Sequence, residues 1–141
     1  MTADPSTGFV SRAQNFEDII LWRALRHVKS GFYVDIGSQD PRNDSVSRAF
    51  YEKGWRGVHV EPTPEYARKL RADRPDEPVY EVALSDQDGE MTFYVSSDSG
   101  VSTGLEQNSE ANRRLGLTVE PIIVPVKRLA TLSSAFVDKT V

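Results

Sequence analysis

The sequence predicts an α/β protein built around a parallel sheet. Two short apolar segments each end on a carboxylate, the first at Asp35 and the second at Glu61, and a helical pattern follows each of them. Alternating strands and helices are typical of βαβ units with right-handed crossovers. In such sheets the ligand lies beyond the carboxyl ends of the strands, so we expect both acids to face one crevice.

The composition is that of a single globular domain. The chain has 141 residues, of which 38% are hydrophobic and 27% charged, and single domains most often have about 100–150 residues. The net charge of −4 leaves no basic surface of the kind that nucleic-acid binding needs. The absence of cysteine excludes disulfides, thiolate metal sites and a cysteine nucleophile.

No targeting or membrane signal is visible in the sequence. Residues 1–10 are polar and lack an apolar core, and we expect them to form a disordered tail. No later stretch approaches the roughly 20 apolar residues of a membrane span. The sequence therefore predicts a cytoplasmic protein with neither a nucleic-acid nor a membrane partner.

The first half of the chain shows two strand-helix units. A helix is expected over residues 15–29, followed by a buried strand over 32–36 and a second helix over 45–53. The first helix is expected to bury Phe16, Ile19, Ile20, Ala24, Leu25 and Val28. A second strand is expected over 55–61. Thr63 and Pro64 then provide the N-cap and first position of a third helix, which ends near Arg74.

The remaining segments are shorter. Strands are expected over 79–84 and 91–95, the latter antiparallel to its predecessor or bent away from it, and a weak helix over 105–115. The apolar run 122–126 is expected to be a strand, and Pro121 before it and Pro125 within it predict a sheet edge or a bend. A short helix is expected over 129–136. We expect the first three strands to be parallel neighbours with the first strand central. The basic residues Arg68, Lys69, Arg71 and Arg74 are expected to form a solvated helix face.

The two strand-end acids predict a nucleoside site. Glu61 stands 26 residues after Asp35, near the roughly 20-residue offset at which an acid binds the ribose of a nucleotide cofactor. Gly37 permits close approach of a ligand to the backbone. No G-x-G-x-x-G is present to wrap a pyrophosphate, which disfavours a nicotinamide-dependent oxidoreductase and favours S-adenosylmethionine.

Six segments of the chain resemble, in order and spacing, the FkbM family of S-adenosylmethionine-dependent methyltransferases. They are QNFED (14–18), GFYVDIGSQDP (31–41), SVS (45–47), FYEKGWRG (50–57), VEPTP (60–64) and ALS (83–85). The resemblance implies a Rossmann-like class I methyltransferase fold with three αβα layers in a single domain, 1–141. It further implies methyl transfer to a hydroxyl of a sugar, polysaccharide or natural product.

The same resemblance implies a set of cofactor-binding residues. They are Gln14, Asp35, Gly37, Ser38, Glu61, Ser85 and Asp86. Asp35 and Gly37 would belong to the cofactor loop, Glu61 would bind the ribose, and Ser85 and Asp86 would lie beside the adenine. For the segment 14–18 an alternative is a helix cap formed by Asn15 and Asp18.

The sequence identifies no catalytic base and contains no segment that matches the later strands of the family's sheet. The family continues into a Lys-Ile-Asp-Val-Glu-Gly strand, which is absent before Val141, so we expect a sheet truncated after its first half that self-associates through the open edge. A non-catalytic binding or scaffolding fragment is the alternative function. His27 and His59 are expected to be structural, no metal ligands are identified, and Asp44 or Ser102 and Thr103 could line an acceptor pocket.

Overall fold

The computed structural model describes residues 8–97 and 101–136 and shows a mixed α/β protein. The first half of the chain contains α1 (Glu17–Leu25), β1 (Phe32–Ile36), α2 (Val46–Glu52), β2 (Arg56–Val60), α3 (Pro64–Asp73) and β3 (Val79–Tyr80). The second half contains β4 (Ala83–Leu84), β5 (Gly89–Ser96), α4 (Glu106–Arg114), β6 (Val119–Lys127) and α5 (Leu129–Ser133). The α/β class predicted from the sequence is confirmed.

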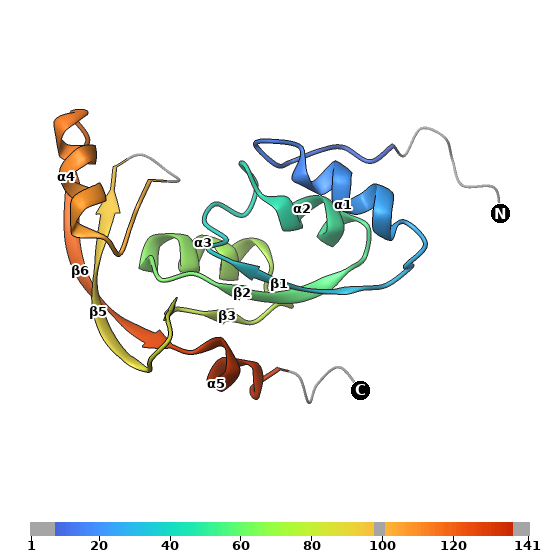
Figure 1. Ribbon diagram of the computed structural model, residues 1–141. Coiled ribbons are helices and arrows are strands. Elements are labelled where there is room, and N and C mark those ends of the chain that lie inside the picture. The colour runs from blue at the N-terminus through green and yellow to red at the C-terminus, as the bar shows by residue number, and fades with distance from the viewer. Residues whose placement is uncertain (1–7, 98–100, 137–141) are drawn as a thin grey trace.

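The strands β1, β2 and β3 form a parallel sheet in the order β1-β2-β3. In Figure 1 the helices α1, α2 and α3 lie on one face of this sheet and α5 lies on the other. The expected parallel pairing is confirmed, but the expectation that the first strand is central is wrong, because β2 occupies the middle. An apolar run of five residues fits a central or an edge strand equally well.

β2 forms the core of the parallel sheet. Its residues 57–60 are all buried, and Val58 and Val60 pack against Leu132 and Phe136 of the α5 segment. By contrast, β1 alternates exposed and half-buried residues. No other strand in the described part of the chain pairs with the outer edge of β1.

The second sheet has the order β4-β6-β5 and corrects one strand prediction. The expected strand 79–84 is divided, since Val79 and Tyr80 pair with β2, whereas Ala83 and Leu84 pair with β6. The strand 91–95 forms part of β5, which runs antiparallel to its predecessor β4 as expected but pairs with β6, because β6 lies between the two. The Asp88 carboxylate accepts the amide of Arg128 at 2.7 Å, which anchors the end of β6 beside the turn before β5.

The prolines predict a sheet edge or a bend for β6. The edge is wrong, because β6 lies between β4 and β5, while Figure 1 shows β6 as a curved strand. β4 pairs only with Val126 and Lys127 of β6. Among the described residues, Pro121 and Pro125 therefore lie where one side of β6 has no strand partner, and their missing N–H groups cost no ladder hydrogen bond on that side.

Helix α1 differs from its prediction in length and in its buried face. It covers Glu17–Leu25, and its only buried residue is Asp18, while Phe16 and Ile20 are 62% and 67% exposed. The Asp18 carboxylate accepts the amides of Arg12 and Ala13 and the hydroxyl of Ser11. It thus anchors the preceding segment, and the cap expected from Asn15 and Asp18 does not form.

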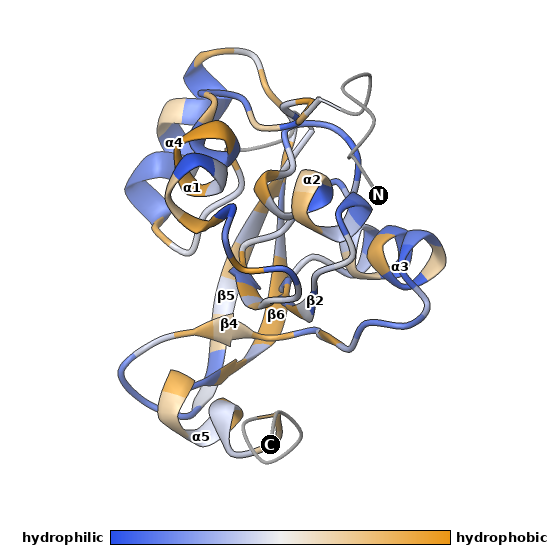
Figure 2. Cartoon of the chain, turned by 90° about the vertical axis from the view of Figure 1, so that its right-hand side faces the viewer, coloured by the Kyte–Doolittle hydropathy of each residue, from blue (hydrophilic) through white to orange (hydrophobic). Residues whose placement is uncertain are grey.

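The helices α2, α3 and α4 follow the predictions closely, with one exception, while α5 ends at Ser133, three residues before its expected end. They begin and end within a residue or two of the expected bounds, and in Figure 2 most of α4 has the colour of hydrophilic residues. The exception is Arg74 at the end of α3, which is fully buried, whereas Arg68, Lys69 and Arg71 are exposed. Among the described residues no helix combines the length and apolar character that a membrane crossing requires.

Candidate functional site

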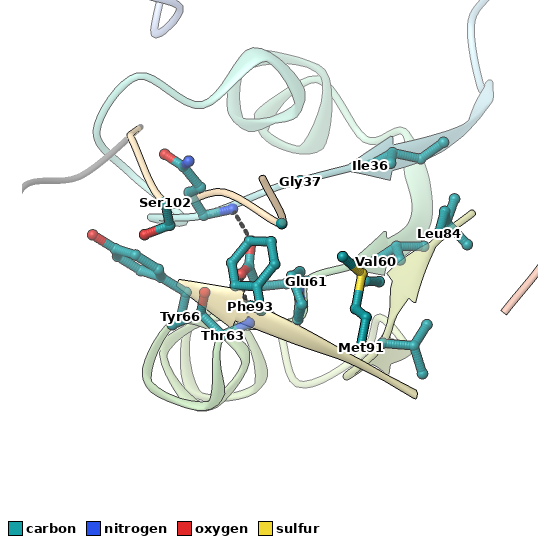
Figure 3. A pocket seen from close by; sticks show the side chains of 15 residues that line it. Ile36, Gly37, Val60, Glu61, Thr63, Tyr66, Leu84, Met91, Phe93 and Ser102 are labelled. Carbon is teal, nitrogen blue, oxygen red and sulfur yellow. Dashed lines mark hydrogen bonds between the residues drawn. The ribbon is translucent and has the colours of Figure 1, made fainter. Parts of the chain in front are cut away.

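A cavity of about 330 Å³ lies between the parallel sheet and the second sheet, at the carboxyl ends of β1 and β2 (Figure 3). Its lining residues are Ile36, Gly37, Gln39, Val60, Glu61, Pro62, Thr63, Tyr66, Val82, Ala83, Leu84, Met91, Phe93, Ser102 and Gly104. The volume falls in the range of about 300–1,000 Å³ that is typical of small-molecule sites. The crevice is therefore at the edge of the sheet where the strand-end acids predict it.

Glu61 is the acidic group of this cavity. It follows β2 directly and is only 2% exposed. One carboxylate oxygen, Oε2, accepts the backbone amide of Gln39 at 2.9 Å, and the other, Oε1, accepts that of Thr63 at 2.8 Å. Figure 3 shows both bonds converging on Glu61. Each oxygen retains a second lone pair, so the fixed carboxylate can still accept hydrogen bonds from a ligand.

Gly37 and Gln39 bring the backbone to the cavity wall. Both adopt left-handed conformations, with φ of 71° and 52°, and the amide of Gly37 donates to the carbonyl of Val60 at 2.8 Å. A Cβ placed on Gly37 would meet no protein atom within 4 Å, so the space beside it is open. A glycine here both permits the turn and leaves room for a ligand.

The opposite wall is apolar and comes from the second sheet. Met91 and Phe93 of β5 face the cavity together with Val60 and Leu84, and the hydroxyl-bearing residues Tyr66 and Ser102 lie at its rim (Figure 3). Such a wall suits the flat face of a nucleobase or another apolar surface. Sequence analysis identifies Ser102 as a possible pocket residue but misses Tyr66, Met91 and Phe93. The alternation along 91–95 indicates an apolar side for that strand without indicating what it faces.

Asp35 does not line this cavity. Its carboxylate accepts a hydrogen bond from the hydroxyl of Ser47 on α2, and Asp35 lines a separate apolar hollow between β1, α1 and α2. The residue after Gly37, Ser38, is also turned away: its hydroxyl donates to the carbonyl of Asp35 at 2.8 Å and is hydrogen-bonded to Nδ1 of buried His59 at 3.0 Å. The structure thus separates the two strand-end acids that sequence analysis places in one crevice.

The other residues identified from the resemblance lie outside the cavity wall. Ser85 and Asp86 are exposed just after Leu84, and the Ser85 hydroxyl donates to Asp86 at 3.1 Å. Gln14 is exposed in the segment before α1, and Asp44 is exposed before α2. Of the seven residues, Gly37 and Glu61 line the cavity.

No histidine lines the cavity. His59 is fully buried, with Nε2 bonded to the Glu77 carboxylate at 2.7 Å, and His27 is exposed after α1. Tyr33 donates to the same carboxylate at 2.5 Å, and its burial together with this bond raises the pKa of the phenol far above its ordinary value. The described residues contain no group of three or more histidines and acids arranged to hold a metal ion.

Comparisons with known proteins identify a family. A family model described as the methyltransferase FkbM domain matches residues 35–141, about three quarters of the chain. The match includes the whole of the cavity lining. Neither the curated proteins nor the solved structures contain a match to the chain.

Proposed function

The chain belongs to the FkbM methyltransferase domain family, and from this premise we propose that it binds S-adenosylmethionine in the cavity around Glu61. The observation that carries the proposal is the buried Glu61 carboxylate, which two backbone amides hold at the carboxyl end of β2. The proposed acceptor is a hydroxyl group of a sugar, polysaccharide or natural product, which makes the protein an O-methyltransferase or its cofactor-binding half.

The residues present fit such a cofactor. An adenosine ribose offers two vicinal hydroxyls, which match the free lone pairs of a carboxylate. The open space beside Gly37 accommodates a chain that passes close to the backbone. Met91 and Phe93 supply an apolar surface for the base, while no backbone nest for a pyrophosphate is needed.

The chain's own residues contribute binding and orientation. When bound, S-adenosylmethionine supplies a sulfonium methyl group for in-line displacement by the acceptor oxygen. Because that reaction depends on alignment, a carboxylate fixed by Gln39 and Thr63 contributes by fixing the ribose end of the cofactor. The apolar wall of the second sheet excludes water from one side of the cavity.

The test pairs a protein change with a ligand change. Isothermal titration measures the binding of S-adenosylhomocysteine and of its 2′,3′-dideoxy analogue to the wild type and to Glu61→Ala. In the wild type, loss of the hydroxyls should weaken binding by roughly 10- to 150-fold, the equivalent of about 1.5–3 kcal/mol for charge-assisted hydrogen bonds. In Glu61→Ala the two ligands should bind equally. Because both ligands are measured on the same variant, any loss of stability caused by freeing the amides of Gln39 and Thr63 affects both affinities alike.

A matched control is Glu65→Ala, since Glu65 is an exposed acid of α3 that pairs with Lys69 and lies outside the cavity wall. It should bind both ligands as the wild type does. Equal discrimination against the dideoxy ligand in wild type and Glu61→Ala would refute the assignment of Glu61. Binding of S-adenosylmethionine without transfer to any hydroxyl acceptor would instead support a non-catalytic binding module.

A further inference from the structure

A buried cluster of polar residues lies beneath the connection between β1 and α2. Its centre is formed by Arg74, Glu77 and His59, whose side chains are 0% exposed. Charged groups are rarely buried unless they have several partners, because removal from water costs several kcal/mol per ion. The partners of these three side chains therefore indicate what the cluster does.

Arg74 bonds three points of the β1–α2 connection. Its Nη2 donates to the carbonyl of Pro41 at 2.8 Å and to the hydroxyl of Ser45 at 3.1 Å. Its Nη1 donates to the hydroxyl of Ser47 at 2.8 Å, and that hydroxyl in turn donates to the carboxylate of Asp35. One guanidinium, with its planar set of donors, thus links the end of β1, the loop and the start of α2.

His59 and Glu77 hold the first residues of the same loop. His59 contacts Ser38 through Nδ1 and Glu77 through Nε2. Glu77 also accepts the amide of Gly57 at 2.8 Å, which ties the cluster to β2. Ser38 stands between Gly37 and Gln39, two residues of this loop that line the cavity.

The loop needs such support because of its backbone. Three of its residues, Gly37, Gln39 and Asp44, have φ between 52° and 71°. Left-handed conformations of residues other than glycine cost of order 1 kcal/mol or more each and persist only where the surroundings enforce them. The buried cluster holds the loop in this conformation from the protein interior. On the cavity side, the Glu61 carboxylate holds it through the amide of Gln39.

We propose that Arg74 is a positioning residue, which holds the loop 37–44 in the conformation that presents Gly37 and Gln39 to the cavity. Within the described part of the chain its hydrogen bonds go to no residue of the cavity wall, so it acts through Pro41, Ser45 and Ser47. The proposal rests on the proposed function for the ligand, S-adenosylmethionine. Its structural part, the fixing of the loop, is measurable without any ligand.

The experiment compares Arg74→Met, Arg74→Lys and the milder Ser45→Ala with Arg71→Met. Arg71 is a matched control on the same helix, since it is exposed and pairs with Glu81. Amide hydrogen exchange of Gln39, Arg42 and Asn43 should accelerate in the Arg74 variants and, to a smaller extent, in Ser45→Ala. Amides of β6 and all amides of Arg71→Met should exchange as in the wild type.

Titration supplies the second measurement. In the Arg74 variants and Ser45→Ala, affinity for S-adenosylhomocysteine should fall, by roughly tenfold or more for Arg74→Met. Affinity for adenosine, which uses Glu61 and the apolar wall, should fall by a smaller factor, because the amide of Thr63 still holds the Glu61 carboxylate when the loop loosens. Arg74→Lys should recover part of the loss, because an ammonium can replace only one or two of the bonds.

The outcomes separate the two proposals. Unchanged exchange in the loop of a folded Arg74 or Ser45 variant overturns the positioning role, as does an equal loss of affinity for both ligands. If Arg74→Met is unfolded by circular dichroism, the result for Ser45→Ala decides. Failure of the wild type to bind S-adenosylhomocysteine refutes the proposed function, while the exchange measurement still decides whether Arg74 fixes the loop.

Discussion

The two sheets of this protein are stabilised in different ways. The parallel sheet β1-β2-β3 has an apolar core on the side of α5, but beside the end of α3 it buries polar groups, among them Arg74, Glu77 and His59. The second sheet, β4-β6-β5, has a small apolar core of Ala83, Val124 and Val126 with Met91, Phe93 and Ile122 packed against it. The cavity lies where these two kinds of packing meet.

The difference indicates a division of roles. Hydrogen bonds are directional, so a hydrogen-bonded polar cluster fixes a loop in one conformation. Apolar packing is non-directional and tolerates repacking, so it suits a wall that needs only shape. The polar side of the molecule should therefore be sensitive to single substitutions, and the apolar side should be more tolerant.

The largest effect is expected for Glu77→Leu. The substitution deprives the buried Arg74, the amide of Gly57 and the hydroxyl of Tyr33 of their carboxylate partner. Breaking a buried ion pair costs about 3–5 kcal/mol of unfolding free energy. Urea denaturation measures the loss. Glu81→Ala, which removes an exposed partner of Arg71, should cost about 0–1 kcal/mol. Equal losses in both variants would contradict the proposed division.

A glycine near each sheet gives the second comparison. A Cβ on Gly57 would lie 2.2 Å from the carbonyl oxygen of Tyr33, whereas a Cβ on Gly104 would lie 2.3 Å from the terminal methyl of Met91. Backbone cannot move aside, so Gly57→Ala should cost about 1–3 kcal/mol or more.

Met91 can move, so Gly104→Ala should change the unfolding free energy by less than about 0.5 kcal/mol. The added methyl group nevertheless takes up part of the cavity, so Gly104→Ala should bind S-adenosylhomocysteine more weakly than the wild type does. Thermal melts and titrations check both statements. A melting temperature lowered more by Gly104→Ala than by Gly57→Ala would show that the second sheet is the rigid one.

Within the second sheet, Val126→Ala should cost about 1–2 kcal/mol, because it removes two buried methyl groups from a core that can partly collapse. Val126 is 4% exposed and Ile123, on the same strand, is 66% exposed. Ile123→Ala should therefore change the unfolding free energy by less than about 0.5 kcal/mol. A loss above 3 kcal/mol for Val126→Ala would show that this core is as intolerant as the polar cluster.

The smallest effect on stability concerns the outer edge of β1. Val34 and Ile36 are 37% and 53% exposed there, and an exposed apolar edge favours pairing with a second copy. Val34→Lys should reduce self-association in sedimentation velocity experiments with little change in melting temperature. Ile123→Lys serves as the control. A wild type that stays monomeric at all concentrations would remove this expectation.

Local sequence patterns predict the elements and the position of the cavity. Proline and threonine at the start of α3, and the apolar runs before Asp35 and Glu61, specify structure through neighbours a few residues away. For the same reason Glu61 and Gly37 are found from the sequence. Both follow strands whose carboxyl ends must meet at one edge of a parallel sheet.

Long-range partners are not visible in those patterns. In the sequence, Arg74 belongs to a basic run that is predicted to be exposed. Only the fold brings Pro41, Ser45 and Ser47 within hydrogen-bond distance of its guanidinium. Asp35 is predicted to bind the ligand, yet its carboxylate accepts a hydrogen bond from the hydroxyl of Ser47. The insertion of β6 between β4 and β5 depends on residues some 40 positions apart, such as Asp88 and Arg128.

By itself, the sequence determined the α/β class, the order of strands and helices, the family resemblance and the acid at the end of β2. These depend on local propensity and on a motif whose residues are close in the chain. The tertiary structure alone decided which strand is central, which acid enters the cavity and which charges are buried. The reason is physical: burial and hydrogen bonding are set by atoms that the chain brings together only when it folds.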